Sequence, residues 1–355
     1  MSWRTWLVGA ACAAMLILLA SCGTSPESSK GASHASKAAA AGKGAPLRFG
    51  LALGSGGLGD KGFNDLQYTG MARACAAHDV SFVYEAAGSG EPQSVEAQFD
   101  RMLAKGCNVL FCAGGEEMQG PIDEYAPQHP NVRFVLMDKP LMRPLPNAAS
   151  AVFRTSEPAY LAGMLAARMS RSGVLGVVGG MKLPTVMEYV VGFRAGARAA
   201  RKDIRVITEF IAERDATANP WRNPGMGNEL ASELMAEGAD ILFGVAGGSS
   251  LGVFDAATRE GRYAIGVDSD QDHLAKGIIL TSVVKRLDNV IEDMVGRVIN
   301  GSFEPKAYVY RLRDGGVGLS NMRFSRQLIP DEVFAEIART RQKIITGDIV
   351  VPTVY

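Results

Sequence analysis

The chain has 355 residues, more than one hydrophobic core usually serves, so its length predicts two lobes. Its composition, 47% hydrophobic and 21% charged, is typical of a soluble globular protein with ample core. Lysine plus arginine equals aspartate plus glutamate at 37 each, and this balance argues against nucleic acid or an acidic surface as a partner.

The first 21 residues are typical of a secretion signal peptide. One basic residue, Arg4, precedes an apolar run over residues 7–20 that is too short and ends too abruptly for a resident transmembrane helix. The run ends in LASC at residues 19–22, which resembles the lipobox of bacterial lipoproteins. This resemblance implies that Cys22 becomes the mature N-terminus and carries diacylglycerol and palmitate. The alternative is a signal peptide followed by an incidental cysteine.

Residues 22–45 contain this cysteine and a stretch rich in Ser, Ala, Gly and Lys without an aromatic residue. Such a stretch buries too little surface to fold, so we interpret it as a flexible tether. The lipid on Cys22 would then hold the protein at the cell membrane, facing the periplasm or the cell exterior.

Three further cysteines follow, Cys75, Cys107 and Cys112. The last two lie five residues apart in a strand-like run, so they point to opposite faces and a bond between them is excluded. Because the count is odd and no C-x-x-C occurs, buried free thiols are favoured over a disulfide framework or a metal site.

From Leu47 onward, short apolar runs alternate with longer amphipathic stretches. The predicted strands are residues 49–53, 81–85, 109–112, 134–137, 175–178, 206–210, 241–245, 264–267, 280–284 and 307–312. The predicted helices are residues 65–78, 95–105, 121–129, 158–169, 185–200, 228–237, 251–260, 287–300 and 330–346. This alternation indicates an α/β protein with parallel sheets and right-handed crossovers.

Two blocks of similar outline predict two doubly wound parallel-sheet lobes with a ligand cleft between them. The last part of the chain has too few elements for a third lobe, so it should complete the other two through multiple hinge crossovers. We assign residues 46–151 and about 270–304 to the N-terminal lobe. Residues 152–269 and about 305–355 are assigned to the C-terminal lobe.

A glycine-rich turn follows the first predicted strand, with Gly54, Gly56 and Gly59 in the pattern G-x-G-x-x-G. The pattern permits a dinucleotide-binding site. However, a pyrophosphate at this helix start would sit beside the carboxylate of Asp60, which is unfavourable. A neutral polar ligand suits Asp60 better.

A catalytic set is not apparent in the sequence, so we expect a binding protein without a cofactor or a metal, rather than an enzyme. His34, His78, His129 and His273 are scattered, and H-E-x-x-H, G-x-S-x-G and P-loop patterns do not occur. An exported NAD-type enzyme remains a less favoured alternative, because a protein carrying a cofactor usually leaves by the twin-arginine route.

Polar residues instead cluster where predicted strands end. They are Asp60 and Asn64 after the first strand, then Asp138, Asp268 and Lys285. Carboxylates in one cleft can accept hydrogen bonds from the vicinal diol of a sugar or ribose, and Phe63 adds a flat face for a heterocycle. Each residue also has a structural alternative: a helix cap, a turn, a solvated ion pair or core packing.

Two further features of the second block are candidates for the cleft. Gly247 and Gly248 follow the strand at residues 241–245, and their amides could donate to a ligand or only permit tight packing. Trp221 lies between two prolines in a predicted loop and is a candidate second stacking face.

Several ordered motifs resemble the basic membrane protein family of bacterial lipoproteins. GLGDKGFND at residues 57–65 is similar to the signature G-x-x-D-K-S-F-N, with Gly62 where serine is usual. The further matches are FVLMD at 134–138, EPAYLAG at 157–163, glycines at 179 and 180, GF at 192–193, GAD at 238–240, AGGSSLG at 246–252, IGVDSDQ at 265–271 and TSVVKR at 281–286. The resemblance covers residues 47–318.

The resemblance implies a type I periplasmic-binding-protein fold and a monomeric lipoprotein that delivers a nucleoside, a purine by preference, to an ABC transporter permease. It implies that Phe63 stacks on the base and that Asp60 and Asn64 meet its polar edges. It also implies that Asp138, Asp268 and Lys285 hold the ribose, and it extends to Trp221 through a similar W-x-D-P segment. A binding protein for a free sugar or another small polar ligand is the main alternative.

Overall fold

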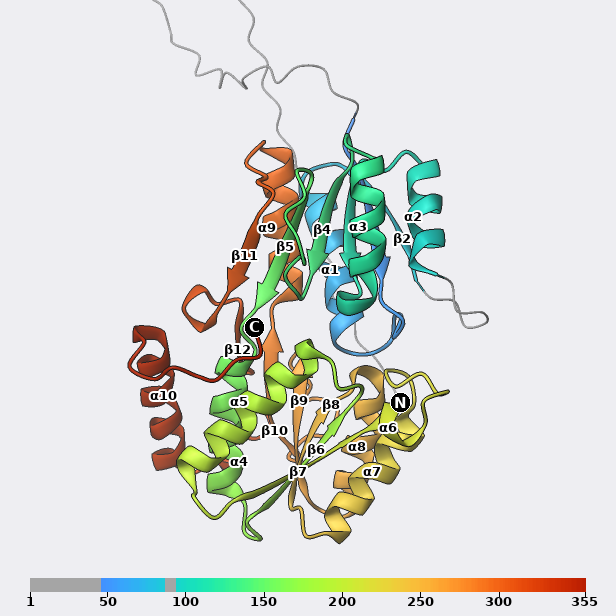
Figure 1. The fold of residues 1–355 in the computed structure, drawn as a ribbon. Coiled ribbons are helices and arrows are strands. Elements are labelled where there is room, and N and C mark those ends of the chain that lie inside the picture. Colours follow the sequence, from blue (N-terminus) through green and yellow to red (C-terminus); the bar gives the residue numbers. More distant parts are fainter. Residues whose placement is uncertain (1–45, 87–93) are drawn as a thin grey trace, which may run out of the picture. The chain divides into compact units, whose positions relative to one another are not determined.

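The computed structural model describes residues 46–86 and 94–355 of the chain. Residues 46–355 form one compact unit that contains two six-stranded sheets, one in each of two lobes (Figure 1). The predicted signal peptide, the cysteine at position 22 and the tether lie outside the described residues.

The first lobe contains a sheet in which all strands run parallel. Its strand order is β11 (Ala307–Tyr310), β5 (Ala148–Phe153), β4 (Arg133–Met137), β3 (Val109–Ala113), β1 (Arg48–Leu53) and β2 (Ser81–Glu85). Its helices are α1 (Phe63–Ala77), α2 (Val95–Ala104), the 3-10 helix η1 (Gly115–Met118), α3 (Gln119–Gln128) and α9 (Leu287–Ile299). Helix α9 packs on α1.

The second lobe contains a sheet that is parallel except for its last strand pair, β10 with β12. Its strand order is β12 (Val317–Leu319), β10 (Ile279–Lys285), β9 (Tyr263–Asp268), β8 (Ile241–Val245), β6 (Val174–Gly179) and β7 (Arg205–Phe210). Its helices are α4 (Ser156–Met169), α5 (Pro184–Ala200), α6 (Ile211–Arg214), α7 (Pro224–Ala236), α8 (Ser250–Arg259) and α10 (Asp331–Thr346), with the 3-10 turns η2 (Gly247–Ser249), η3 (Leu312–Asp314) and η4 (Arg326–Leu328).

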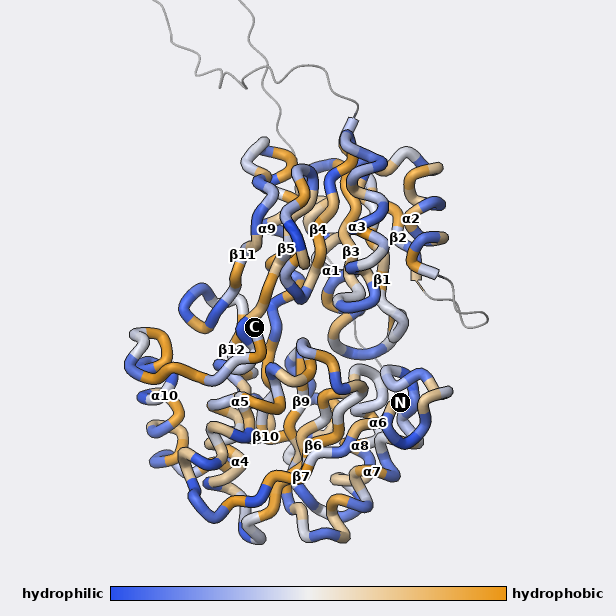
Figure 2. The backbone as a smooth tube through the Cα atoms, in the orientation of Figure 1, coloured by the Kyte–Doolittle hydropathy of each residue, from blue (hydrophilic) through white to orange (hydrophobic). Residues whose placement is uncertain are grey.

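The central strands of both sheets are apolar along their whole length. Strands β3 and β8 read VLFCA and ILFGV, and every residue in them is buried. Parallel sheets are covered by helices on both faces, so their strands read as continuous hydrophobic runs rather than as alternating patterns. In Figure 2 the strands are accordingly mostly orange, whereas the helices alternate between orange and blue.

Glycine permits the close approach of α4 and α5 in the second lobe. A Cβ atom added to Gly163 would lie 2.0 Å from the carbonyl oxygen of Phe193, and one added to Gly196 would lie 1.8 Å from that of Tyr160. Any side chain at these positions would separate the two helices. Cys75, Cys107 and Cys112 are buried and free, as predicted.

The chain passes between the lobes three times, after β5, after β10 and after β11. This agrees with multiple crossovers, but it corrects the predicted lobe boundaries. Strand β10, which we assigned to the N-terminal lobe, pairs with β9 in the second sheet. Strand β11, which we assigned to the C-terminal lobe, pairs with β5 in the first.

Two strands were not predicted from the sequence. Strand β5 reads AASAVF, and its small residues carry little strand propensity even though all six are buried. Strand β12 has only three residues. Both complete a sheet near a hinge, so tertiary pairing rather than local sequence decides their conformation.

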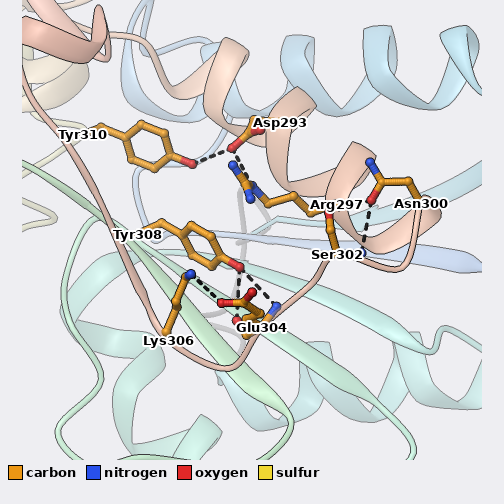
Figure 3. A network of polar contacts seen from close by, with 8 residues as sticks. All are labelled: Asp293, Arg297, Asn300, Ser302, Glu304, Lys306, Tyr308 and Tyr310. Atoms are coloured by element: carbon orange, nitrogen blue, oxygen red, sulfur yellow. Dashed lines mark hydrogen bonds and ion pairs between the residues drawn. The ribbon is translucent and has the colours of Figure 1, made fainter.

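A polar network fastens α9 to β11 after the chain returns to the first lobe (Figure 3). The Tyr310 hydroxyl and Arg297 Nε each donate to Oδ2 of Asp293, both at 2.9 Å. The Arg297 guanidinium also lies 4.8 Å from the ring centroid of Tyr308. The Tyr310 ring stacks on Phe153 at 5.6 Å, so these contacts secure β11 as the edge strand of the first sheet.

Candidate ligand-binding site

A cavity of about 430 Å³ lies between the carboxyl ends of the two sheets and is lined by residues of both lobes. This is where ligands bind in open α/β sheets. Of the residues that the sequence predicted for the site, those lining the cavity are Asp60, Phe63, Asn64, Asp138, Trp221, Gly247, Asp268 and Lys285. Gly248 does not line it; an added Cβ there would lie 3.1 Å from the carbonyl oxygen of Trp221, which indicates a packing role.

Asp60 lies in the turn between β1 and α1 and is 4% exposed. Its carboxylate accepts hydrogen bonds from the backbone N–H groups of Gly62 at 3.0 Å and Asn64 at 2.8 Å. Burial raises the pKa of Asp60, although these hydrogen bonds oppose the shift. Asp60 therefore satisfies free amides at the start of α1 and also lines the cavity, so the structural and functional predictions for it are compatible.

Asn64 joins the glycine turn to α1. Its Oδ1 accepts from the backbone N–H of Gly54 at 3.1 Å, and its Nδ2 donates to Oδ2 of Asp60 at 3.0 Å. These two bonds use the amide oxygen and one of its two amide hydrogens. Asn64 is therefore held in one orientation before any ligand arrives.

Lys285, at the end of β10, is the centre of a buried ion cluster and is only 2% exposed. Its Nζ lies 2.7 Å from Oδ1 of Asp138 and 3.7 Å from Oδ1 of Asp268. The Tyr189 hydroxyl donates to that same Asp268 oxygen at 2.7 Å. Two carboxylates from different lobes thus share one buried ammonium group, which makes their positions depend on one another.

Burial raises the pKa of Asp138 to about 6, against the opposing effect of Lys285. Burial and the neighbouring carboxylates of Asp268 and Asp138 also raise the pKa of Tyr189 well above its ordinary value. Tyr189 therefore remains a hydrogen-bond donor at any physiological pH.

Both aspartates of this cluster have left-handed backbone conformations at the ends of their strands. The φ angle is 81° at Asp138 after β4 and 64° at Asp268 at the end of β9. Aspartate is among the few non-glycine residues that tolerate this region, and such conformations gather at binding sites. The two strand ends are thereby turned so that both carboxylates reach Lys285.

Aromatic rings surround the ammonium group of Lys285. The ring centroid of Phe63 lies 5.1 Å from Nζ, and that of Tyr189 lies 5.2 Å from it. Contacts of this length are favourable for a desolvated cation. The Phe63 ring is partly exposed and lines the cavity, so one of its surfaces is available to a planar group.

Trp221 lines the cavity from the loop before α7, and glycine gives it room. A Cβ atom added to Gly180 would lie 2.3 Å from Cζ3 of the Trp221 indole. Its loop also reaches the first lobe, because Nδ2 of Asn219 donates to the Ser55 carbonyl at 2.9 Å. Trp221 thus faces the ligand space from the second lobe.

Further contacts hold the two lobes together across the glycine turn. The carbonyl of Lys61 accepts from the Ser269 hydroxyl at 2.6 Å and from Nε2 of Gln271 at 3.2 Å. Lys61 has a φ angle of 54°, a conformation that this tight turn requires. With the bond between Lys285 and Asp138, these contacts define a closed arrangement of the lobes.

Three ionisable side chains that line the cavity were not among the predicted site residues, namely Tyr189, Glu116 and Glu117. Tyr189 lies within α5, where neither a strand end nor a glycine marks it. The two glutamates follow β3 in η1, and their position after a strand was the signal that could have found them. Glu117 accepts from the Ser55 N–H at 2.8 Å, and Glu116 forms an ion pair with Lys139.

The cavity wall is consequently acidic. The carboxylates of five residues line it: Asp60, Glu116, Glu117, Asp138 and Asp268. Among the described residues that line the cavity, only Lys285 has a cationic side chain. Residues 46–86 and 94–355 contain no group of three His, Cys, Asp or Glu side chains placed to hold a metal ion.

Comparisons with known proteins show the family of the chain. The family described as "ABC transporter substrate-binding protein PnrA-like" matches residues 51–354. The chain is 29% identical to Basic membrane protein B of Borrelia garinii subsp. bavariensis, over 84% of this chain and 86% of that protein. It is 26% identical to the ABC transporter nucleoside-binding protein BmpA of Lactococcus lactis subsp. cremoris, over 86% of this chain and 89% of that one.

A solved structure shows the same fold. The solute-binding protein of an ABC transporter system from Aeropyrum pernix superposes with a TM-score of 0.77 at 24% identity, covering 86% of this chain and 94% of that one. The fold is therefore the predicted α/β fold of periplasmic binding proteins, with two parallel-sheet lobes. None of the helices in the described ranges is long and apolar enough to cross a membrane.

Proposed function

Because the chain belongs to the PnrA-like family of ABC transporter substrate-binding proteins, we propose that it captures a nucleoside between its lobes and delivers it to an ABC transporter permease. The family consists of substrate-binding proteins, which supports the proposal of a binding protein. A nucleoside-binding relative supports the choice of ligand.

The observation that carries the proposal is the buried cluster of Asp138, Lys285 and Asp268 beside the Phe63 ring. A vicinal diol can donate to the carboxylates and accept from the ammonium group, which is the pattern that a ribose offers. Phe63 and Trp221 line the same cavity from opposite lobes and supply flat faces for a base. The base and the ribose together would fill a cavity of about 430 Å³ better than a free sugar.

The charge of the cavity argues for an unphosphorylated ligand. A pyrophosphate would have to enter a space lined by five carboxylates, and the ammonium group of Lys285 is already paired with two of them. Like charges at short range in a poorly hydrated space are strongly unfavourable. This weighs against the alternative of an NAD-type enzyme, despite the G-x-G-x-x-G pattern.

The proposal includes attachment to the membrane through lipid on Cys22, with the protein a monomer on a flexible tether. A bound ligand favours the closed state only as far as it contacts both lobes, and the cavity offers such contacts. The closed form would be the one presented to the permease, at the cell membrane and facing the periplasm or the cell exterior.

Calorimetry of the full chain in detergent, with adenosine, guanosine, inosine, uridine, ribose and NAD, tests the proposal. We expect nucleosides to bind and ribose and NAD to bind much more weakly. The Asp268→Ala variant should lose about 2 kcal/mol of binding free energy, because the ligand hydroxyls lose a charged hydrogen-bond acceptor. Binding of ribose alone, with an affinity that Phe63→Ala leaves unchanged, would favour the sugar alternative, and binding of none of these compounds would contradict the proposal.

A further inference from the structure

The last residues of the chain contact both lobes beside the cavity. After α10, which packs on α4 of the second lobe, the chain runs back toward the space between the two sheets (Figure 1). Val351 is part of the hydrophobic core, and the three residues that follow Pro352 lie near side chains of α5, η1 and the first hinge segment. We call residues 353–355 the C-terminal clasp.

The clasp is attached to the second lobe through Glu188 of α5. This carboxylate is 1% exposed. Its Oε1 accepts hydrogen bonds from the Thr353 hydroxyl and from the backbone N–H of Val354. The backbone nitrogen of Tyr355 lies 3.4 Å from the same oxygen. Lifting the clasp would leave a buried carboxylate without these donors, which is costly. The clasp therefore moves with the second lobe.

Two of these residues also contact the first lobe and its hinge segment, Tyr355 through its hydroxyl and Thr353 through the hydroxyl that also donates to Glu188. The Tyr355 hydroxyl donates to Oε1 of Glu116 at 3.5 Å, and Glu116 lines the ligand cavity. Arg154, which follows β5 in the first hinge segment, donates to the Thr353 hydroxyl at 3.1 Å. If the lobes separate while the clasp stays on Glu188, the contact between Tyr355 and Glu116 must break.

Tyr355 is suited to this contact at any physiological pH. Burial, together with the nearby carboxylates of Glu116, Asp138 and Glu188, raises the pKa of Tyr355 above its ordinary value. Its hydroxyl thus stays protonated and can donate. Glu116 also forms an ion pair with Lys139, so the phenol meets a carboxylate that is already held in place.

We propose that the C-terminal clasp stabilises the closed arrangement of the lobes, with Tyr355 as a positioning residue that links the second lobe to Glu116 beside the cavity and slows the escape of the ligand. The part of the inference that concerns ligand escape rests on the proposed function. The part that concerns the two lobes does not, because it depends only on contacts within the chain.

The first test is the Tyr355→Phe variant of the full chain, which removes the hydroxyl and keeps the ring. Stopped-flow measurements with adenosine, inosine and guanosine should show dissociation about fivefold faster, with association and melting temperature unchanged. Tyr84→Phe is the matched control, because Tyr84 is 44% exposed on the edge strand β2. A dissociation rate equal to that of the wild type would overturn the role in ligand escape.

A second test needs no ligand. Trp3→Phe and Trp6→Phe leave Trp221 as the one tryptophan of the chain, and it lines the cavity. In this background, Tyr355→Phe should increase the quenching of Trp221 fluorescence by acrylamide, whereas Tyr84→Phe should not. Equal quenching in both variants would contradict the proposal that the clasp stabilises the closed arrangement of the lobes.

The two tests separate the clasp from the proposed function. If the wild-type protein binds none of the nucleosides, the proposed function fails and the quenching experiment alone decides the clasp. If nucleosides bind, a double-mutant cycle of Tyr355→Phe with Glu116→Gln should be non-additive, because the two side chains act through one contact. Additive effects would show that Tyr355 does not act through Glu116.

Discussion

Replacement of Gly180 by alanine tests the role of Trp221 by moving the indole without changing it. An added Cβ would lie 2.3 Å from Cζ3 and 2.5 Å from Cε3 of Trp221. Since carbon atoms in contact are optimally about 3.5 Å or more apart, the ring must retreat by roughly 1 Å. The backbone of Gly180 is held on both sides, because its N–H donates to the Val245 carbonyl and its carbonyl accepts from the Ala212 N–H. The loop that carries Trp221 should therefore move, rather than the end of β6.

The expected loss of affinity follows from the value of base stacking. Stacking of a base on an aromatic side chain is worth about 1–3 kcal/mol, and a displaced ring would lose much of this. We therefore expect Gly180→Ala to bind nucleosides roughly tenfold more weakly, which corresponds to about 1.4 kcal/mol. The melting temperature should change little, because Trp221 is only half-buried and lies in a loop.

The assay combines calorimetry with the fluorescence of Trp221 in the chain that carries Trp3→Phe and Trp6→Phe. Gly120→Ala is the matched control, since a Cβ at this position in α3 meets no atom within 4 Å. A shifted Trp221 emission with unchanged affinity would refute the role of the ring in stacking. Unchanged emission would refute the predicted displacement itself.

Four further predictions concern the ion cluster, the core and the anchor. The pKa of Asp138 is about 6 in the folded protein against an ordinary 3.8, so nucleoside affinity should fall as the pH drops through 6, and calorimetry of Asp138→Asn should show no such dependence. Because the pKa of Asp138 is higher in the folded state than in the unfolded state, protonation of Asp138 stabilises the folded protein. This contribution to stability is fully present below about pH 4 and is lost as the pH rises from about 4 to 6. A contribution of Asp138 that instead decreases as the pH falls below 6 would contradict the prediction. Lys285→Met leaves two buried carboxylates without their cation and should lower the free energy of unfolding in urea by about 3–5 kcal/mol, whereas Lys306→Met at the surface should change it little. Asn147→Ala removes an amide whose Nδ2 lies within 3.0 Å of three backbone carbonyl oxygens. The free energy of unfolding in urea should therefore fall by about 2 kcal/mol, while the affinity for nucleosides stays the same. Cys22→Ser should release the protein from the membrane fraction, and retention there would argue against lipid on that residue.

Local hydrophobic pattern was enough to predict most strands of the two sheets. Strands β3 and β8 are short apolar runs between glycine-containing turns, and such runs are buried in any parallel sheet. The pattern was insufficient at β5, where alanine and serine predominate, and at β12, which is three residues long. At these places pairing with a neighbouring strand supplies the stabilisation that propensity lacks.

Local hydrophobic pattern also does not predict to which lobe a segment near the end of the chain belongs. Strand β10 could have extended either sheet on its composition, yet it pairs with β9 and places Lys285 at the end of the second sheet. Helix α9 then packs on α1 of the first lobe. Because the chain changes lobe directly after Lys285, this lysine can reach a carboxylate from each lobe.

The glycine turn and the residues at strand ends followed from sequence because parallel strands bring their carboxyl ends to one edge of a sheet, whatever the rest of the chain does. That rule predicts from the sequence alone that Asp60, Asp138 and Asp268 lie at one cleft. Tyr189, the acidic turn at Glu116 and the clasp at Tyr355 followed only from the folded chain. Their contacts join segments 70 or more residues apart, and the way two lobes meet depends on the packing of whole elements rather than on any short stretch of sequence.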